Sequence, residues 1–226
     1  MKKNRIWLLT NYNINPSPFL SELDEQYLII NKGEKSCLSS ISINKSKIIQ
    51  LENSGHNLSD YLYYIIENYK NLPDSIGFAK GNLVPRHISL ENFRLRRELD
   101  GFVSLYGDLK TFKPKFKLFN KFGLVAQQIG PGYYSEITNN WYIKSRPSGK
   151  YFPRLEDFFN NFFYRPPPKY ITFIPGGCMV VPAQNILSWS KETYQKLFEV
   201  VTYDYFPVEA FHLERSMLYF FCYPKE

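Results

Sequence analysis

The feature that most constrains the fold of this chain is a strand–helix–strand pattern over residues 47–79. In its middle part, apolar side chains recur at i, i+3, i+4, i+7, i+8 and i+11, which is one face of an α-helix: Leu58, Tyr61, Leu62, Ile65, Ile66 and Tyr69. Asn57 is in position to cap this helix, and Pro73 to end it. The pattern predicts two parallel strands joined by a right-handed crossover, as in α/β proteins.

Short apolar runs elsewhere in the chain predict the rest of the sheet. The runs at 6–9, 27–30, 48–51 and 75–79 all close in polar residues, with or without glycine, as is typical of buried and largely parallel strands. Further helices are expected at 90–99, 155–163, 190–201 and from 207 onward, and further strands at 102–106 and 170–174. The sequence shows no internal repeat and no linker. We therefore expect one domain over residues 1–226, with a Rossmann-like, mainly parallel sheet flanked by helices.

Composition excludes several classes of protein. No window approaches the roughly 20 unbroken apolar residues of a membrane span. The apolar run behind the N-terminal charges is too short for a signal peptide. The three cysteines are far apart and lack C-x-x-C spacing, which favours free thiols in the cytoplasm. A net charge of +7 favours anionic partners.

Polar loops follow the expected strands at the edge where α/β sheets bind ligands. These loops are Glu52-Asn53-Ser54-Gly55-His56, Lys80-Gly81-Asn82, Tyr106-Gly107-Asp108 and Pro175-Gly176-Gly177. The first leads into a helix N-terminus, which favours an anion, although the same residues are also typical of a simple helix cap. The sequence contains no G-x-G-x-x-G, no P-loop and no G-x-S-x-G, so it predicts neither a Rossmann dinucleotide site nor a serine hydrolase.

The C-terminal helix carries an unusual set of polar residues. On a helical wheel, one polar stripe contains Glu209, His212, Arg215, Ser216 and Tyr219. Glu214 falls on the apolar arc instead, where a carboxylate must be paired, hydrogen-bonded or raised in pKa, and such groups are enriched at functional sites. The alternative is a structural bridge to a neighbouring Arg or Lys. Glu209 and His212, at i and i+3, are also spaced to supply two metal ligands.

Five lysines alternate with four phenylalanines over residues 110–122. This pattern is compatible with binding to a membrane surface or a polyanion. It is equally typical of core phenylalanines beside solvated lysines.

The stretch 51–74 resembles a family of uncharacterised bacterial, fungal and viral proteins that look like distant GT-A glycosyltransferases. The family carries the signature N-x-G-R-E-x-x-x-Y-L-x-x-I-I-x-N-Y-x-x-L-P-D, and the matching positions here are Asn53, Gly55, Tyr61, Leu62, Ile65, Ile66, Asn68, Tyr69, Leu72, Pro73 and Asp74. His56 and Asn57 replace the family's Arg-Glu pair. The turn 80–82 with His87, and the block 101–105, resemble the next two family segments.

Two later segments extend the resemblance. Residues 174–182 resemble the acceptor-side segment of GT-A enzymes, and 212–221 resemble their late H-x-x-E-R helix, whose carboxylate lies near the site of sugar transfer. The resemblance implies that Glu214 or Glu209 acts as general base or oxocarbenium stabiliser, with His212 beside it. It also implies an acceptor close to Gly176 and Gly177.

The resemblance further implies a donor site with these residues: Glu52, Asn53, Gly55, His56, Lys80, Gly81, Asn82, Arg86, His87 and Asp108. GT-A enzymes usually hold the donor diphosphate through Mn²⁺ or Mg²⁺ on a D-x-D motif. This sequence has no D-x-D, and Asp108 is the nearest candidate. Either cations such as Lys80, Lys110 or Arg86 neutralise the phosphates without a metal, or the chain has lost activity.

Three functions remain open at this point. The first is transfer of a sugar from a nucleotide-sugar donor to a glycan or glycolipid acceptor in surface polysaccharide or lipooligosaccharide assembly. It implies a cytoplasmic protein, with peripheral contact at the inner face of the membrane as a variant. The second is a non-catalytic module that binds a glycan or nucleotide. The third is binding to a membrane or nucleic acid through residues 110–122, with nucleic acid the less favoured partner.

Overall fold

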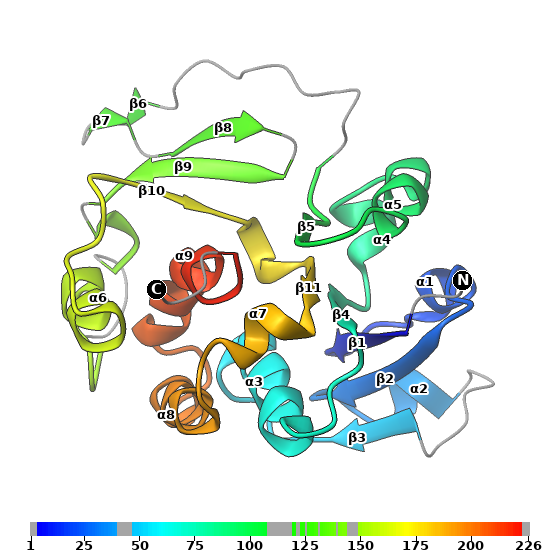
Figure 1. Ribbon diagram of the computed structural model, residues 1–226. Helices are drawn as coiled ribbons and strands as arrows, with labels where there is room; N and C mark the ends of the chain where they lie inside the picture. Colours follow the sequence, from blue (N-terminus) through cyan, green and yellow to red (C-terminus); the bar gives the residue numbers. More distant parts are fainter. Residues whose placement is uncertain are drawn as a thin grey trace.

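The computed structural model describes residues 4–39, 47–107, 119–120, 123–124, 126–130, 132–138, 140–143 and 149–222. It is an α/β structure built around a mixed six-stranded sheet with the order β3-β2-β1-β4-β11-β5 (Figure 1). The strands are β1 (Arg5–Asn11), β2 (Gln26–Asn31), β3 (Ile48–Gln50), β4 (Ser75–Lys80), β5 (Val103–Ser104) and β11 (Met179–Pro182). The four strands expected in the first 80 residues are confirmed.

Strand direction within this sheet decides where ligands can bind. β3, β2, β1 and β4 are parallel neighbours, whereas β11 is antiparallel to both β4 and β5. β3 and β4, the strands of the predicted crossover unit, are parallel, but β2 and β1 lie between them. The carboxyl ends of the four parallel strands therefore share one edge of the sheet, and β11 begins at that same edge.

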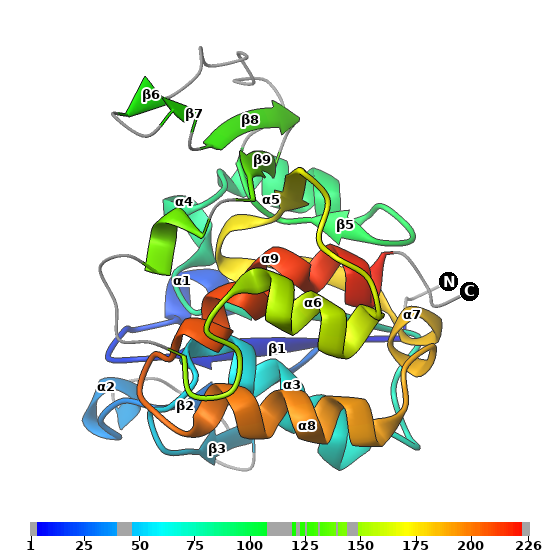
Figure 2. The ribbon, with the colours of Figure 1, turned by 90° about the vertical axis from the view of Figure 1, so that its left-hand side faces the viewer.

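Helices cover both faces of the sheet (Figures 1 and 2). One face packs against α3 (His56–Asn68), α6 (Leu155–Phe163), α7 (Ala183–Leu187), α8 (Lys191–Thr202) and α9 (Val208–Phe221). The other packs against α1 (Ser17–Leu20), α2 (Ser36–Ser39), α4 (Leu83–Arg86) and α5 (Leu90–Arg97). Along β1, Leu8 joins the first core while Trp7 and Leu9 join the second, as the two-residue period of a strand requires.

A smaller antiparallel sheet lies beside α9. Its order is β10 (Tyr170–Phe173), β9 (Tyr133–Ile137) and β8 (Ala126–Gly130), and a separate hairpin joins β6 (Phe119–Asn120) to β7 (Gly123–Leu124). The strand expected at 170–174 is thus confirmed, but it belongs to this second sheet. Two short 3₁₀ helices, η2 (Trp141–Ile143) and η3 (Pro175–Gly177), also lie among the described residues.

Helix boundaries confirm most of the sequence expectations. Ser190 caps α8 through its side chain, which accepts a hydrogen bond from the Thr193 N–H. The expected cap of α3 is wrong, because Gly55 with φ 65° holds the N-cap position and Asn57 lies inside the helix. α3 also ends at Asn68, ahead of Pro73. Over the described ranges, no helix combines the length and the apolar character needed to cross a bilayer.

Candidate functional site

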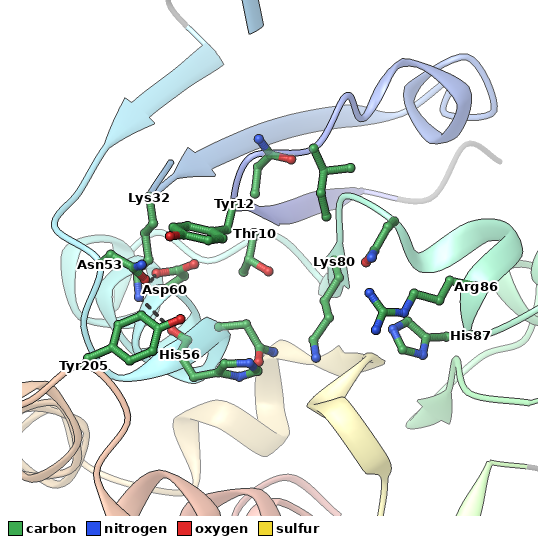
Figure 3. A pocket seen from close by; sticks show the side chains of 14 residues that line it. Thr10, Tyr12, Lys32, Asn53, His56, Asp60, Lys80, Arg86, His87 and Tyr205 are labelled. Atoms are coloured by element: carbon green, nitrogen blue, oxygen red, sulfur yellow. Dashed lines mark hydrogen bonds and ion pairs between the residues drawn. The ribbon is translucent and has the colours of Figure 1, made fainter. Parts of the chain in front are cut away.

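A pocket of about 270 Å³ lies at the carboxyl edge of the parallel strands (Figure 3). The segments after β1, β2, β3 and β4 and the loop between α8 and α9 contribute its lining: Thr10, Asn11, Tyr12, Ile14, Lys32, Asn53, His56, Asn57, Asp60, Lys80, Asn82, Arg86, His87 and Tyr205. Polar side chains meet here because parallel strands end at one edge, the usual ligand position in open α/β sheets.

Six of the ten predicted donor-site residues line this pocket: Asn53, His56, Lys80, Asn82, Arg86 and His87. Asp108 lies outside the described residues, as does most of the 110–122 stretch with Lys110. Glu52 lines a neighbouring cavity of about 580 Å³ between the loop after β3, α3 and α8. Gly55 and Gly81 are structural. A side chain at Gly55 would meet the Val201 carbonyl oxygen, and one at Gly81 would meet Asn11.

Sequence reasoning missed several lining residues. Lys32 does follow an expected strand, and position alone could have identified it as a candidate. Asp60 lies within the expected helix, where no local pattern indicates a ligand site. Tyr205 comes from the loop between α8 and α9, where no local pattern indicates a site.

A buried ion pair joins Lys32 to Asp60 beneath the pocket. The Lys32 Nζ lies 2.8 Å from Asp60 Oδ1, and the two side chains are 5% and 1% exposed. Nζ also donates to Ser59 Oγ at 2.6 Å, to the His56 carbonyl oxygen at 2.7 Å and to the Ser54 carbonyl oxygen. Burial lowers the pKa of Lys32, and burial raises the pKa of Asp60 to about 7 against the opposing effect of Lys32. The pair therefore fixes the loop that leads into α3.

Lys80 and Arg86 make the other side of the pocket cationic. Within the part of the chain that the structure describes, neither side chain forms an ion pair. His87 directly follows Arg86 in sequence, and its pKa is lowered to about 4, first by burial and then by Lys80 and Arg86. His87 is therefore neutral near pH 7 and does not add charge. The two uncompensated cations favour an anionic ligand at this position.

Gly176 is not itself a lining residue, but it lies against two residues that line the pocket, Lys80 and Asn57. Its φ of 74° lies in the left-handed region, and a Cβ atom there would stand 3.0 Å from Lys80 Nζ. Its N–H donates to Glu214 Oε1 at 2.6 Å, and its carbonyl oxygen accepts from Asn57 Nδ2 at 2.9 Å. Gly177 packs instead against Leu58 and Met217 in the core. Neither glycine of the predicted acceptor-side pair lines the pocket, and only the first contacts residues that do.

The polar stripe of α9 is buried. Glu209 is fully buried and accepts hydrogen bonds from the N–H groups of Tyr151 and Phe152, at 2.7 and 3.1 Å, and from the Tyr203 hydroxyl at 2.8 Å. His212 is also fully buried, with Nδ1 at 2.9 Å from the Tyr142 hydroxyl and Nε2 at 3.0 Å from the Phe152 carbonyl oxygen.

Burial lowers the pKa of His212 to about 4, so its ring is neutral near pH 7. Glu209 and His212 do not line the pocket. They fasten the segment around Phe152 to α9 and are not arranged as a metal-binding pair. The structure therefore gives no support to a catalytic position for these two residues.

Glu214 does not line the pocket either, but among the three predicted catalytic residues it is the one that contacts Gly176. Its side chain is 21% exposed, and its Oε2 accepts from Arg215 at 2.7 Å. Arg215 in turn pairs with Glu136 of β9 at 2.8 Å. The expected bridge to a neighbouring arginine is confirmed. The contact with Gly176 additionally ties Glu214 to the residue that touches Lys80.

The described residues do not fit a divalent metal ion. They contain no group of three His, Cys, Asp or Glu side chains placed to hold one. The carboxylate in the described lining of the pocket, Asp60, is already paired with Lys32.

Comparison with known proteins adds no family assignment, because no protein-family model, curated protein or solved structure matches the chain. The resemblance to GT-A glycosyltransferases therefore stays a prediction.

Proposed function

We propose that this chain is a GT-A-like glycosyltransferase that binds a nucleotide-sugar donor in the pocket and transfers the sugar to a glycan or glycolipid acceptor. The observation that carries the proposal is the pair of uncompensated cations, Lys80 and Arg86, in a pocket at the carboxyl ends of parallel strands. Two adjacent cations match the charge of a diphosphate. The proposal locates the reaction in the cytoplasm, or at the inner face of the membrane when the acceptor is a glycolipid.

The two sides of the pocket suit the two halves of a nucleotide. Tyr12 and Tyr205 lie on the side of Asn53 and Asp60, whereas Lys80 and Arg86 lie on the other (Figure 3). Tyr12 is 50% exposed and Tyr205 57% exposed, so both rings can contact a base. We assign the nucleoside to the tyrosine side and the phosphates to the cations.

The proposed chemistry uses groups of this chain alone. Lys80 and Arg86 stabilise the negative charge that develops on the departing nucleoside diphosphate. Glu214 takes the proton of the acceptor hydroxyl, whose oxygen forms the new bond to the anomeric carbon as the bond to the phosphate breaks. Stabilisation of an oxocarbenium-like transition state is the alternative role for the same carboxylate.

A non-catalytic nucleotide- or glycan-binding module is the second candidate function. The observation in its favour is that both Glu214 oxygens already accept hydrogen bonds, from Gly176 and Arg215. Such a module would bind the same ligands without turnover.

Ligand binding tests the proposal directly. Thermal unfolding should be measured with UDP, GDP, CMP and ADP and with their sugar conjugates, each with and without Mn²⁺. A ligand at a hundred times its dissociation constant stabilises the native state by about 2.7 kcal/mol, which for a chain of this size raises Tm by roughly 5–10 °C. We expect such a shift with one nucleotide family. If none of these nucleotides raises Tm, the proposal of a donor site is contradicted.

Replacing Lys80 with alanine should weaken binding of the nucleoside diphosphate by about 10- to 100-fold, because a hydrogen bond to a charged group contributes about 1.5–3 kcal/mol. Calorimetric titration measures the change. Binding to the wild type should also weaken with added salt more steeply than binding to the variant. Lys196→Ala is the matched control, since Lys196 is exposed on α8 and contacts Asn161. Equal affinities in wild type and Lys80→Ala would remove Lys80 from the phosphate site.

A further inference from the structure

Asn57 lines the pocket and carries a buried hydrogen-bond acceptor that is unused. The residue is 7% exposed in the first turn of α3, and it lines the pocket together with Lys80. Its Nδ2 donates to the Tyr61 hydroxyl and to the Gly176 carbonyl oxygen, both at 2.9 Å. Its Oδ1 is buried and accepts no hydrogen bond from any described residue. A buried polar atom left without a partner costs about 1–3 kcal/mol, so a ligand that donates to it recovers stability.

The position of Asn57 indicates which part of a ligand would reach it. Asn57 and Glu214 bind opposite ends of the same residue, since one holds the carbonyl oxygen of Gly176 and the other its N–H. Gly176 in turn lies against the Lys80 ammonium. A group that extends beyond phosphates bound at Lys80 toward Gly176 would therefore meet Asn57. The two tyrosines assigned to the nucleoside lie elsewhere in the pocket, on the side away from Lys80 and Arg86 (Figure 3).

We propose that Asn57 determines specificity for the transferred sugar, because its amide group binds Gly176, which lies against Lys80, and the unpartnered Oδ1 of the same amide accepts a hydrogen bond from a sugar hydroxyl. This inference rests on the proposed function and adds the residue that distinguishes a sugar nucleotide from the bare nucleotide. A hydroxyl group suits the site because it donates a hydrogen bond without carrying charge. The same amide also holds Gly176 through Nδ2. One side chain would therefore contact the sugar and position Gly176.

The test compares two ligands that differ only in the sugar. Calorimetric titrations should use the pairs UDP and UDP-glucose, GDP and GDP-mannose, ADP and ADP-glucose, and CMP and CMP-sialic acid. For the pair that binds, the wild type should prefer the sugar nucleotide. Asn57→Ala should lower the affinity for the sugar nucleotide by roughly 3- to 10-fold and leave the affinity for the bare nucleotide nearly unchanged.

Two further variants separate the sugar contact from an effect on folding. Asn57→Asp keeps an acceptor oxygen at the same place, so it should retain the preference for the sugar nucleotide. Its negative charge should lower the affinity for both ligands. Tyr61→Phe removes a partner of Nδ2 and leaves Oδ1 untouched, so it should also keep the preference. Loss of the preference in Tyr61→Phe, which keeps both Oδ1 and the contact with Gly176, would overturn the inference even if Asn57→Ala failed to fold.

The remaining outcomes distinguish the inference from the proposed function. Equal weakening of both ligands in Asn57→Ala would overturn the sugar contact and leave the donor site intact. A wild type that binds none of the eight ligands would overturn the proposed function and the inference with it.

Discussion

Replacing Lys32 with methionine is expected to lower the free energy of unfolding by about 3–5 kcal/mol, because it leaves the buried Asp60 carboxylate without its partner. Lys32 is held by Asp60, by Ser59 and by the carbonyl oxygens of Ser54 and His56. Methionine fills a similar volume but offers no donor to any of them. Urea unfolding of the wild type and the variant measures the difference.

The same variant carries a prediction about pH. The folded-state pKa of Asp60, about 7, lies above the ordinary value of 3.8, so the stability that this group contributes is complete below about pH 4 and is lost as pH rises through 7. Without Lys32, which lowers this pKa, the pKa of Asp60 should rise further. The destabilisation of Lys32→Met should therefore be larger at pH 8 than at pH 5.

The double variant Lys32→Met/Asp60→Asn is the matched control for the ion pair. It removes the uncompensated charge and should recover part of the lost stability, while the carbonyl oxygens of Ser54 and His56 remain without their donor. Equal destabilisation of the single variant at both pH values, or no recovery in the double variant, would show that the charges do not carry the effect.

Replacing Glu214 with glutamine is expected to reduce the rate of sugar transfer by about 10²- to 10⁴-fold, the usual contribution of a general base. Glutamine keeps the shape and can still accept the hydrogen bond from Gly176, but it cannot take a proton. Donor affinity should stay within about twofold of the wild type, and CD spectra should be unchanged. Steady-state transfer assays and donor titrations measure both quantities.

Two comparisons separate catalysis by Glu214 from a purely structural role. If Glu214 only held Gly176 in place, Glu214→Gln would keep most of the activity and Glu214→Ala would lose it, whereas a base predicts equal losses. Glu199→Gln is the control carboxylate, since Glu199 is exposed on α8 and contacts only the Tyr151 hydroxyl in the described structure. Turnover by Glu214→Gln within tenfold of the wild type would rule out the base.

Elements buried on both sides were the most predictable from sequence. β1 and β4 appear as unbroken apolar runs because both faces of these strands are covered by helices. β9 was not predicted, because four of its five residues are only half-buried and Tyr133–Ile137 contains no apolar run. The direction of β11 also escaped prediction, since a buried strand has the same composition in either direction and only the path of the chain decides it.

The site was predictable where it depends on strand ends and unpredictable where it depends on distant pairing. Lys80 is the last residue of β4, and the strand rule identified it, whereas Arg86 was predicted only from the family resemblance. The partnership of Lys32 with Asp60 joins residues from different loops, which no local pattern reveals. The helical wheel of α9 failed differently. It showed that Glu209 and His212 share a stripe, but the stripe faces inward because Tyr151, Phe152 and Tyr142 supply its hydrogen-bond partners.

The antiparallel direction of β11 has a consequence for the order in which the protein matures. β11 starts at the edge where β4 ends, so Gly176, just before β11, lies next to the pocket and contacts Asn57. The two residues are 119 positions apart in the chain. Its second anchor, Glu214, follows 38 residues later. Proteins leave the ribosome N-terminus first. The strand ends and α3 thus emerge early. Gly176 beside Lys80 gains its contact with Glu214 only when α9 has left the exit tunnel. A nascent chain should acquire its sugar selectivity last.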